Sequence, residues 1–89
     1  MKKVDKKYTL KIERNAQKKL FKIPSPYYTK IKKSILELQN NPFPNKCKKL
    51  KGREAFRIRI SDYRVIYEVK NEQLLIIVIE IGHRKNVYK

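Results

Sequence analysis

The chain has 89 residues, of which 24 are Lys or Arg and only 8 are Asp or Glu, so its formal net charge at pH 7 is +16. This length supports one small hydrophobic core, and we predict a single domain over residues 1–89. The longest apolar run, residues 74–79, is far too short to span a bilayer. A surface this basic attracts polyanions, which can be nucleic acid, an acidic protein or an anionic membrane.

The distribution of the basic residues favours nucleic acid among these partners, because arginines cluster near the predicted strands while lysines are spread over helices and loops. The chain starts with basic residues, but no apolar segment follows, so we predict no secretory signal. Cys47 is the one cysteine, which permits no internal disulfide and gives no metal-ligand cluster. These features predict a cytoplasmic protein.

The first elements are a short strand and a helix. Apolar and polar residues alternate from Tyr8 to Ile12, as in a strand. Apolar residues then recur at helical spacing, at Ala16 and Leu20, and Pro24 must end this helix.

A second helix is predicted to follow almost at once. Ser25 is a suitable N-cap, and Pro26 suits the first helical position. Ile31 and Ile35 lie on an apolar stripe with lysines on the opposite face, and residues 40–42 end the helix. Two helices joined by so short a break indicate a helical hairpin.

Residues 43–52 are predicted to form a loop, in which Leu50 points inward and Gly52 permits a turn. Basic residues of this loop lead directly into an arginine-rich strand. We therefore treat three of them, together with the next basic residue along the chain, as candidates to contact a phosphate backbone, although a solvated loop explains the same charges. They are Lys48, Lys49, Lys51 and Arg53.

Residues 55–69 predict a β-hairpin with its turn at Ser61-Asp62. In its first strand, apolar residues alternate with Arg57 and Arg59, so one face suits a core and the other carries two guanidinium groups. In an antiparallel hairpin, Arg64 can join them on one surface. Three planar forks of donors on a rigid sheet form a phosphate-binding surface, and the alternative is a solvated outer face.

Residues 74–81 are almost continuously apolar, broken by Glu80, and predict a strand inside the sheet. A turn at residues 71–72 precedes this strand, and residues 82–89 form a short polar tail. The predicted order is β-α-α-β-β-β. This is an α+β domain, with a mostly antiparallel four-stranded sheet packed against a helical hairpin.

Three segments in this order, KLKG, FRIRISDYRVIYEV and IGHRKNVY, resemble the RelE/ParE superfamily of bacterial and archaeal toxins. The similarity covers nearly the whole chain. RelE-like members are ribosome-dependent endoribonucleases that cut mRNA in the A site, whereas ParE-like members lack the ribonuclease residues and poison DNA gyrase. The shared fold therefore does not decide between these activities.

The resemblance also implies a set of site residues. In RelE-like toxins the catalytic surface uses basic residues on two neighbouring strands, an arginine after the last strand and a tyrosine near the C-terminus. The corresponding positions in this chain are Arg57, Arg59, Arg64, Arg84 and Tyr88. Tyr88 can donate a proton, stack on a base, or only fix the tail to the sheet.

The chain departs from the best-known family pattern at Arg57 and Arg59, where that pattern has lysines. A crowded lysine can lose its proton and act as a base, but arginine keeps its charge. The two arginines are therefore suited to stabilise a transition state and unsuited to be the general base. His83, the only histidine, is the natural candidate, unless strand alternation points it away from Arg84.

We predict a RelE-like mRNA interferase that needs no metal or cofactor and acts on mRNA on the 70S ribosome. One alternative is a ParE-like gyrase inhibitor, since the HR pair also occurs in ParE-like tails. The other is a basic nucleic-acid-binding module without catalysis. The resemblance implies an acidic cognate antitoxin that covers the arginine face or displaces an element of the sheet. We expect a monomer when free, a hetero-oligomer with antitoxin, and no membrane association.

Overall fold

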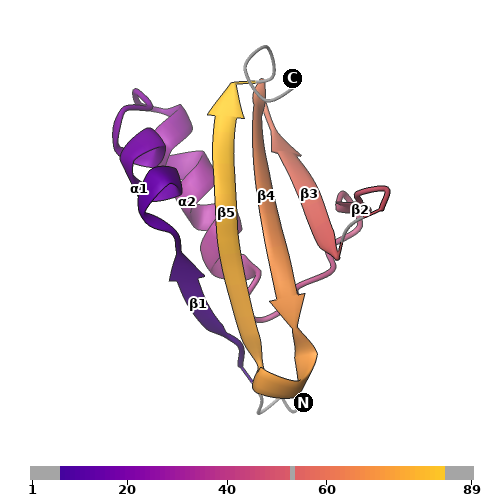
Figure 1. Cartoon of the computed structure of the whole chain (residues 1–89). Helices are drawn as coiled ribbons and strands as arrows, with labels where there is room; N and C mark the ends of the chain where they lie inside the picture. The colour runs from indigo at the N-terminus through magenta and orange to yellow at the C-terminus, as the bar shows by residue number, and fades with distance from the viewer. Residues whose placement is uncertain (1–6, 53, 84–89) are drawn as a thin grey trace, which may run out of the picture.

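The computed structural model describes residues 7–52 and 54–83 (Figure 1). Two helices and five strands follow one another in the order β-α-α-β-β-β-β. Their bounds are β1 Thr9–Ile12, α1 Arg14–Phe21, α2 Tyr27–Glu37, β2 Lys48–Lys49, β3 Ala55–Ile60, β4 Tyr63–Lys70 and β5 Leu75–His83. A single 3₁₀ turn, η1 Asn71–Gln73, links β4 to β5. The predicted α+β class is confirmed.

The five strands form one sheet in the order β1-β5-β4-β3-β2. β1 runs parallel to β5, and the other neighbours are antiparallel. The prediction that residues 74–81 lie inside the sheet is confirmed, because β5 lies between β1 and β4. The prediction of four strands is wrong, because β2 adds a fifth at the edge. Two residues are too few to show an alternating pattern, so the sequence predicts a loop where this strand lies.

Both helices pack on one face of the sheet, and the hydrophobic core lies between them and the strands. Ala16 and Leu20 of α1 and Ile31 and Ile35 of α2 are buried there, as their helical spacing predicts. The sheet contributes its inward-facing side chains to the same core: Ile58, Ile60, Val65, Tyr67, Ile76, Val78 and Ile81. Neither α1 nor α2 covers the opposite face of the sheet.

The start of α2 differs from the predicted cap. The helix begins at Tyr27, Pro26 occupies the N-cap position, and no side chain caps this end. Because the helix starts one residue later than predicted, Ser25 precedes the capping position. The Tyr28 amide instead donates to the backbone carbonyl oxygen of Pro24 at 3.1 Å. The Lys30 amide makes the ordinary helical bond to the carbonyl oxygen of Pro26 at 3.2 Å.

The turns predicted from the sequence are present. Gly52 has φ +72°, a conformation that favours glycine because it has no side chain. Ser61 starts the two-residue turn between β3 and β4 with φ 55°, as tight hairpins require of this position. Leu74, which follows η1, has φ 50° and directs the chain into β5.

The pairing of β4 with β5 contains one irregularity, which determines the side of the sheet to which Glu80 points. Ile66 pairs with Glu80, but the next residue, Tyr67, pairs with Val78, so Ile79 is an extra residue in β5. Such a β-bulge shifts the alternation of the bulged strand by one position. Val78 and Ile81 therefore both face the core, although they are three positions apart along the chain.

Tyr67 joins the loop that follows α2 to the middle of the sheet. Its ring is fully buried, and its Oη donates a hydrogen bond of 2.7 Å to the carbonyl oxygen of Pro42. Burial raises the pKa of the Tyr67 hydroxyl far above its ordinary value, and the neighbouring Cys47 thiol raises it further. The hydroxyl is therefore a permanent donor in the folded protein.

We expect Tyr67→Phe to lower the free energy of unfolding by about 1–2 kcal/mol, because the carbonyl of Pro42 loses its buried donor. Urea titration measures this, with Tyr8→Phe as the control, since the Tyr8 hydroxyl donates to Asn71 at the exposed surface. The stability that the protein gains from the raised pKa of Tyr67 is fully present below the ordinary tyrosine pKa and is lost as the pH rises above it. If Tyr67→Phe and Tyr8→Phe lowered the free energy of unfolding equally, the buried hydrogen bond of Tyr67 would not have the stabilising role given to it here.

No helix among the described residues is long and apolar enough to cross a membrane.

Candidate nucleic-acid interface

Three arginines project from the face of the sheet that the helices leave open. In β3, Ile58 and Ile60 point into the core, so Arg57 and Arg59 point to the opposite side. In β4, Val65 is a core residue, and Arg64 is its outward-facing neighbour. The predicted gathering of the three guanidinium groups on one surface is confirmed by this register. We call this surface the arginine face.

Cross-strand pairing brings like charges directly together on this face. Arg59 of β3 lies opposite Arg64 of β4, and Lys48 of β2 lies opposite Arg57. Like charges in directly opposite positions destabilise a sheet. Folding gains nothing from this arrangement, but a phosphate group between the cations would relieve it.

The arginines differ in exposure. Only 5% of Arg64 is exposed, Arg57 is partly buried and Arg59 is exposed. Arg64 is thus held in a fixed position within the sheet surface, whereas Arg59 can adjust to a ligand. On its other side Arg64 lies opposite Gly82 of β5, which presents no side chain. Among the described residues, ion pairs join Lys49 to Glu54 (3.8 Å) and Lys70 to Glu68 (3.6 Å). Neither of these two pairs includes Arg57 or Arg59.

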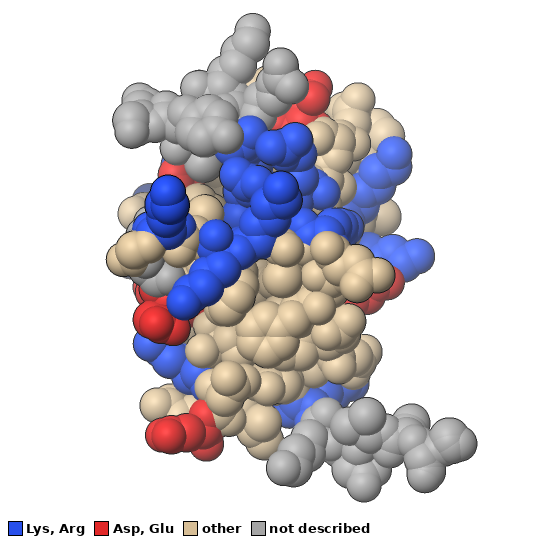
Figure 2. All heavy atoms as spheres, turned by 90° about the vertical axis from the view of Figure 1, so that its right-hand side faces the viewer, with Lys and Arg blue, Asp and Glu red and all other residues tan. Residues whose placement is uncertain are grey.

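Figure 2 shows where positive charge gathers on the side of the molecule that carries β2 and β3. Lys and Arg side chains occupy the upper half of this view, and a largely uncharged surface lies below them. In Figure 1 the upper end of the sheet holds the turn between β3 and β4 and the end of β5. The charge is therefore concentrated at the end of the sheet that carries Arg59 and Arg64.

The loop residues predicted to contact phosphate do not all reach the arginine face. Lys48 is exposed and shares the face of Arg57, its partner across the strands. Lys49 pairs with Phe56, a residue that packs against the core, so it points to the other side. Lys51 is exposed in the turn after β2. Arg53 lies outside the described residues.

His83 lies on the opposite side of the sheet from the arginines. It pairs with Tyr63, and the two rings meet edge to face with centroids 5.3 Å apart. Both side chains line a cavity of about 470 Å³ on the helix side, together with Lys19 and Lys22. Strand alternation thus directs His83 away from the arginine face, the alternative that the sequence left open. Arg84 and Tyr88 lie outside the described residues.

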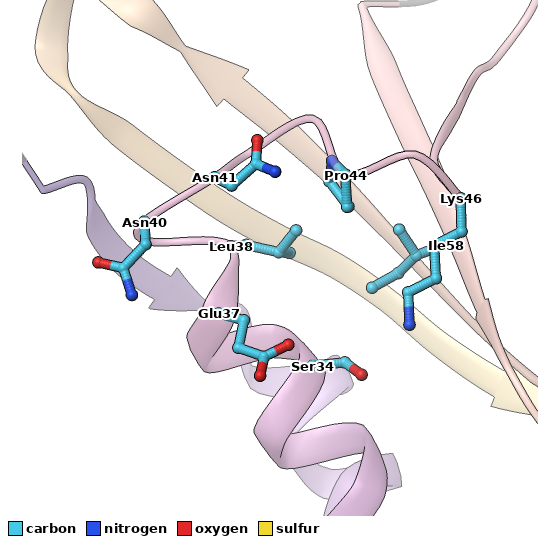
Figure 3. A pocket seen from close by; sticks show the side chains of 8 residues that line it. All are labelled: Ser34, Glu37, Leu38, Asn40, Asn41, Pro44, Lys46 and Ile58. Carbon is cyan, nitrogen blue, oxygen red and sulfur yellow. The ribbon is translucent and has the colours of Figure 1, made fainter. Parts of the chain in front are cut away.

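A second cavity, of about 290 Å³, lies where α2 ends and the chain turns toward β2 (Figure 3). Leu38 and Ile58 form its apolar floor. The polar residues around it are Ser34, Glu37, Asn40, Asn41 and Lys46. Ile58 faces the core, so this cavity is also on the helix side. Neither of these two cavities belongs to the arginine face, which is an open surface suited to an extended polyanion.

Sequence reasoning missed one residue of this face. Ile66 lies between the core residues Val65 and Tyr67, so it points to the outward side of β4. Glu80 pairs with Ile66 and therefore lies on the arginine face. Simple alternation from Ile76 and Val78 would place it in the core. The signal was present: a glutamate at a position that alternation assigns to the core indicates a bulge.

The chain is a small basic α+β domain with three arginines on one face of its sheet. A family model described as the ParE toxin of type II toxin-antitoxin systems matches residues 10–88. The protein RelE1 of Methanocaldococcus jannaschii is 34% identical over 87 residues, which cover 93% of this chain and 97% of that protein. The chain belongs to the RelE/ParE superfamily of toxins.

Two further relatives extend this comparison. The mRNA interferase toxin RelE of Escherichia coli is 29% identical over 80 residues, covering 88% of this chain and 84% of that protein. The archaeal RelE–RelB complex from Pyrococcus horikoshii contains a chain that superposes with a TM-score of 0.80 and 28% identity. That alignment covers 90% of this chain and 98% of the other.

Proposed function

We propose that this protein is a RelE-type mRNA interferase, an endoribonuclease that cuts mRNA in the ribosomal A site in the cytoplasm. The observation that carries the proposal is the direct pairing of Arg59 with Arg64 on a sheet face that also holds Arg57. The relationship to a protein named mRNA interferase toxin supports it.

The proposed reaction is attack of a ribose 2′-oxygen on the adjacent phosphate, which leaves a 2′,3′-cyclic phosphate and a free 5′-hydroxyl. Negative charge grows on the phosphate oxygens as the new bond forms. The guanidinium groups of Arg59 and Arg64 stabilise that charge more than they stabilise the substrate. The sheet already holds Arg64 in place, and the exposed Arg59 adjusts to the phosphate. Arg84 supplies a further cation in this proposal, and Tyr88 stacks on a base or protonates the leaving oxygen. No step requires a metal.

Lys48 and Lys51 extend the positive surface beyond the arginines and are proposed to hold the phosphate backbone of the message or of ribosomal RNA. The sequence also predicts phosphate contacts for Arg53, which lies outside the described residues, and for Lys49, which points to the other side of the sheet. These contacts position the RNA without reading its sequence.

An acidic antitoxin is the proposed protein partner, and it covers the arginine face in a hetero-oligomeric complex. RelE chains of similar fold occur in complexes with RelB, as in the Pyrococcus horikoshii structure. The net charge of +16 makes association with an acidic protein fast and sensitive to salt, and it keeps copies of the free toxin apart as monomers.

Primer extension on a defined mRNA in a reconstituted translation system tests the activity. We expect cuts within A-site codons that appear only when ribosomes are present and that vanish in an Arg84→Ala variant. The same message without ribosomes is the control. An uncut message under active translation would reject the proposal.

A ParE-like gyrase inhibitor is the second candidate, because the family model that matches the chain is that of ParE toxins. This function predicts blocked DNA supercoiling by purified gyrase and no mRNA cuts, so the two assays separate the candidates. Salt-dependent RNA binding without cleavage or gyrase inhibition would instead indicate a nucleic-acid-binding module.

A further inference from the structure

The cations of the arginine face cannot accept the proton that the proposed reaction removes. Attack by the 2′-oxygen requires removal of its proton, and arginine does not give up its charge in proteins. His83 lies on the other side of the sheet, against Tyr63. A carboxylate that shares the face of Arg59 and Arg64 would suit this role.

Glu80 is such a group. It pairs with Ile66, whose outward-facing neighbour two residues earlier in β4 is Arg64. Diagonal neighbours of this kind lie within reach of long side chains in an antiparallel sheet. The carboxylate of Glu80 and the guanidinium of Arg64 therefore border the same small area of the sheet surface.

At the position opposite Arg64, β5 adds no side chain to this area. Gly82, opposite Arg64, is the next outward position after Glu80 and has no side chain. The extra residue Ile79 turns Glu80 outward, and without this bulge Glu80 would point toward the core. Bulges that redirect a side chain are frequent beside active sites.

Glu68 of β4 also lies on this face but forms an ion pair with Lys70. Its carboxylate is 3.6 Å from the ammonium of Lys70, and its partners across the strands are Ala55 and Ile77. It is thus placed at the far end of β4 from Arg64. Of these two glutamates, only Glu80 is beside the arginine pair.

We propose that Glu80 is the general base of the reaction, an inference that rests on the proposed ribonuclease function. Its carboxylate takes the proton from the 2′-hydroxyl, and the 2′-oxygen forms a bond to phosphorus. The bond between phosphorus and the 5′-oxygen breaks, and the leaving 5′-oxygen takes a proton from water. Arg59 and Arg64 stabilise the charged phosphate oxygens throughout. Glu80 then returns its proton to solvent.

Single-turnover cleavage on programmed ribosomes tests this role with Glu80→Gln, which keeps the size of the side chain but cannot accept a proton. We expect the cleavage rate at saturating ribosome concentration to fall about a hundredfold, with the ribosome concentration for half-maximal rate unchanged. Glu68→Gln is the matched control, because it makes the same charge change on the same face and should retain the wild-type rate. Thermal unfolding of each variant verifies its fold.

Chemical rescue gives a second readout that a structural role would not produce. In Glu80→Ala, added acetate or formate should restore part of the cleavage rate, and chloride at the same ionic strength should not. Cleavage by Glu80→Gln at the wild-type rate, or failure of rescue in a folded Glu80→Ala, would overturn the inference and leave the ribonuclease function standing. Absence of cleavage by the wild-type protein would overturn both.

Discussion

Replacement of Arg64 by alanine is expected to lower the rate of ribosome-dependent mRNA cleavage about a hundredfold or more. Arg64 is the most deeply placed of the described arginines on the arginine face, with 5% of its surface exposed, so its guanidinium is held in one position by the sheet. A preorganised donor of this kind contributes to the transition state without reorganisation during the reaction. Its loss should therefore appear mainly in the maximal rate, measured by primer extension under single-turnover conditions.

The controls separate a lost charge from a damaged fold. Arg64→Lys keeps the charge but loses the planar fork of donors, and we expect an intermediate rate. Lys18→Ala removes one exposed positive charge from α1 on the helix side and should change cleavage less than threefold or so. A folded Arg64→Ala protein that cleaves at the wild-type rate would show that the arginine face is not the reaction centre.

Replacement of Ile76 by alanine is expected to lower the free energy of unfolding by about 2–5 kcal/mol. Ile76 is fully buried in β5, with Leu10 of β1 on one side and Val69 of β4 on the other. Deletion of buried methyl groups loses transfer free energy and leaves a cavity that a close-packed core fills only in part. A domain of this size has a total stability of only about 5–15 kcal/mol, so this single change removes much of it.

Denaturant titration of Ile76→Ala should be compared with Leu36→Ala. Leu36 lies on α2 and is 46% exposed, so its truncation should change stability by about 0.5 kcal/mol or less. Equal losses in the two variants would contradict the assignment of the core to the space between the helices and the sheet.

Much of the fold could be predicted from the sequence because its helices and long strands follow simple periods. Ala16 and Leu20 mark the buried side of α1, and alternation along β3 separates the core from the arginine face. β2 could not be predicted, since two residues have no period and their pairing depends on a partner far along the chain. The capping position of α2 was misplaced by one residue because local residue preferences do not fix where a helix starts.

The candidate site was predicted in part for the same reason. The grouping of Arg57, Arg59 and Arg64 followed from alternation in two regular strands, and the register confirms it. Glu80 was missed because the bulge at Ile79 shifts the alternation, and a single charged residue in an apolar run was the one available signal. The roles of Arg84 and Tyr88 stay predictions that lie outside the described residues.

The two-residue strand β2 has a consequence for the behaviour of the protein in concentrated solution. An open sheet edge offers backbone donors and acceptors to any other chain, and edge-to-edge pairing leads to aggregation. Here that edge ends in two exposed lysines, Lys48 and Lys49. A second copy approaching this edge meets the same positive charges at short range. Because salt screens such repulsion, the free protein should tolerate high concentration better at low ionic strength than at high ionic strength.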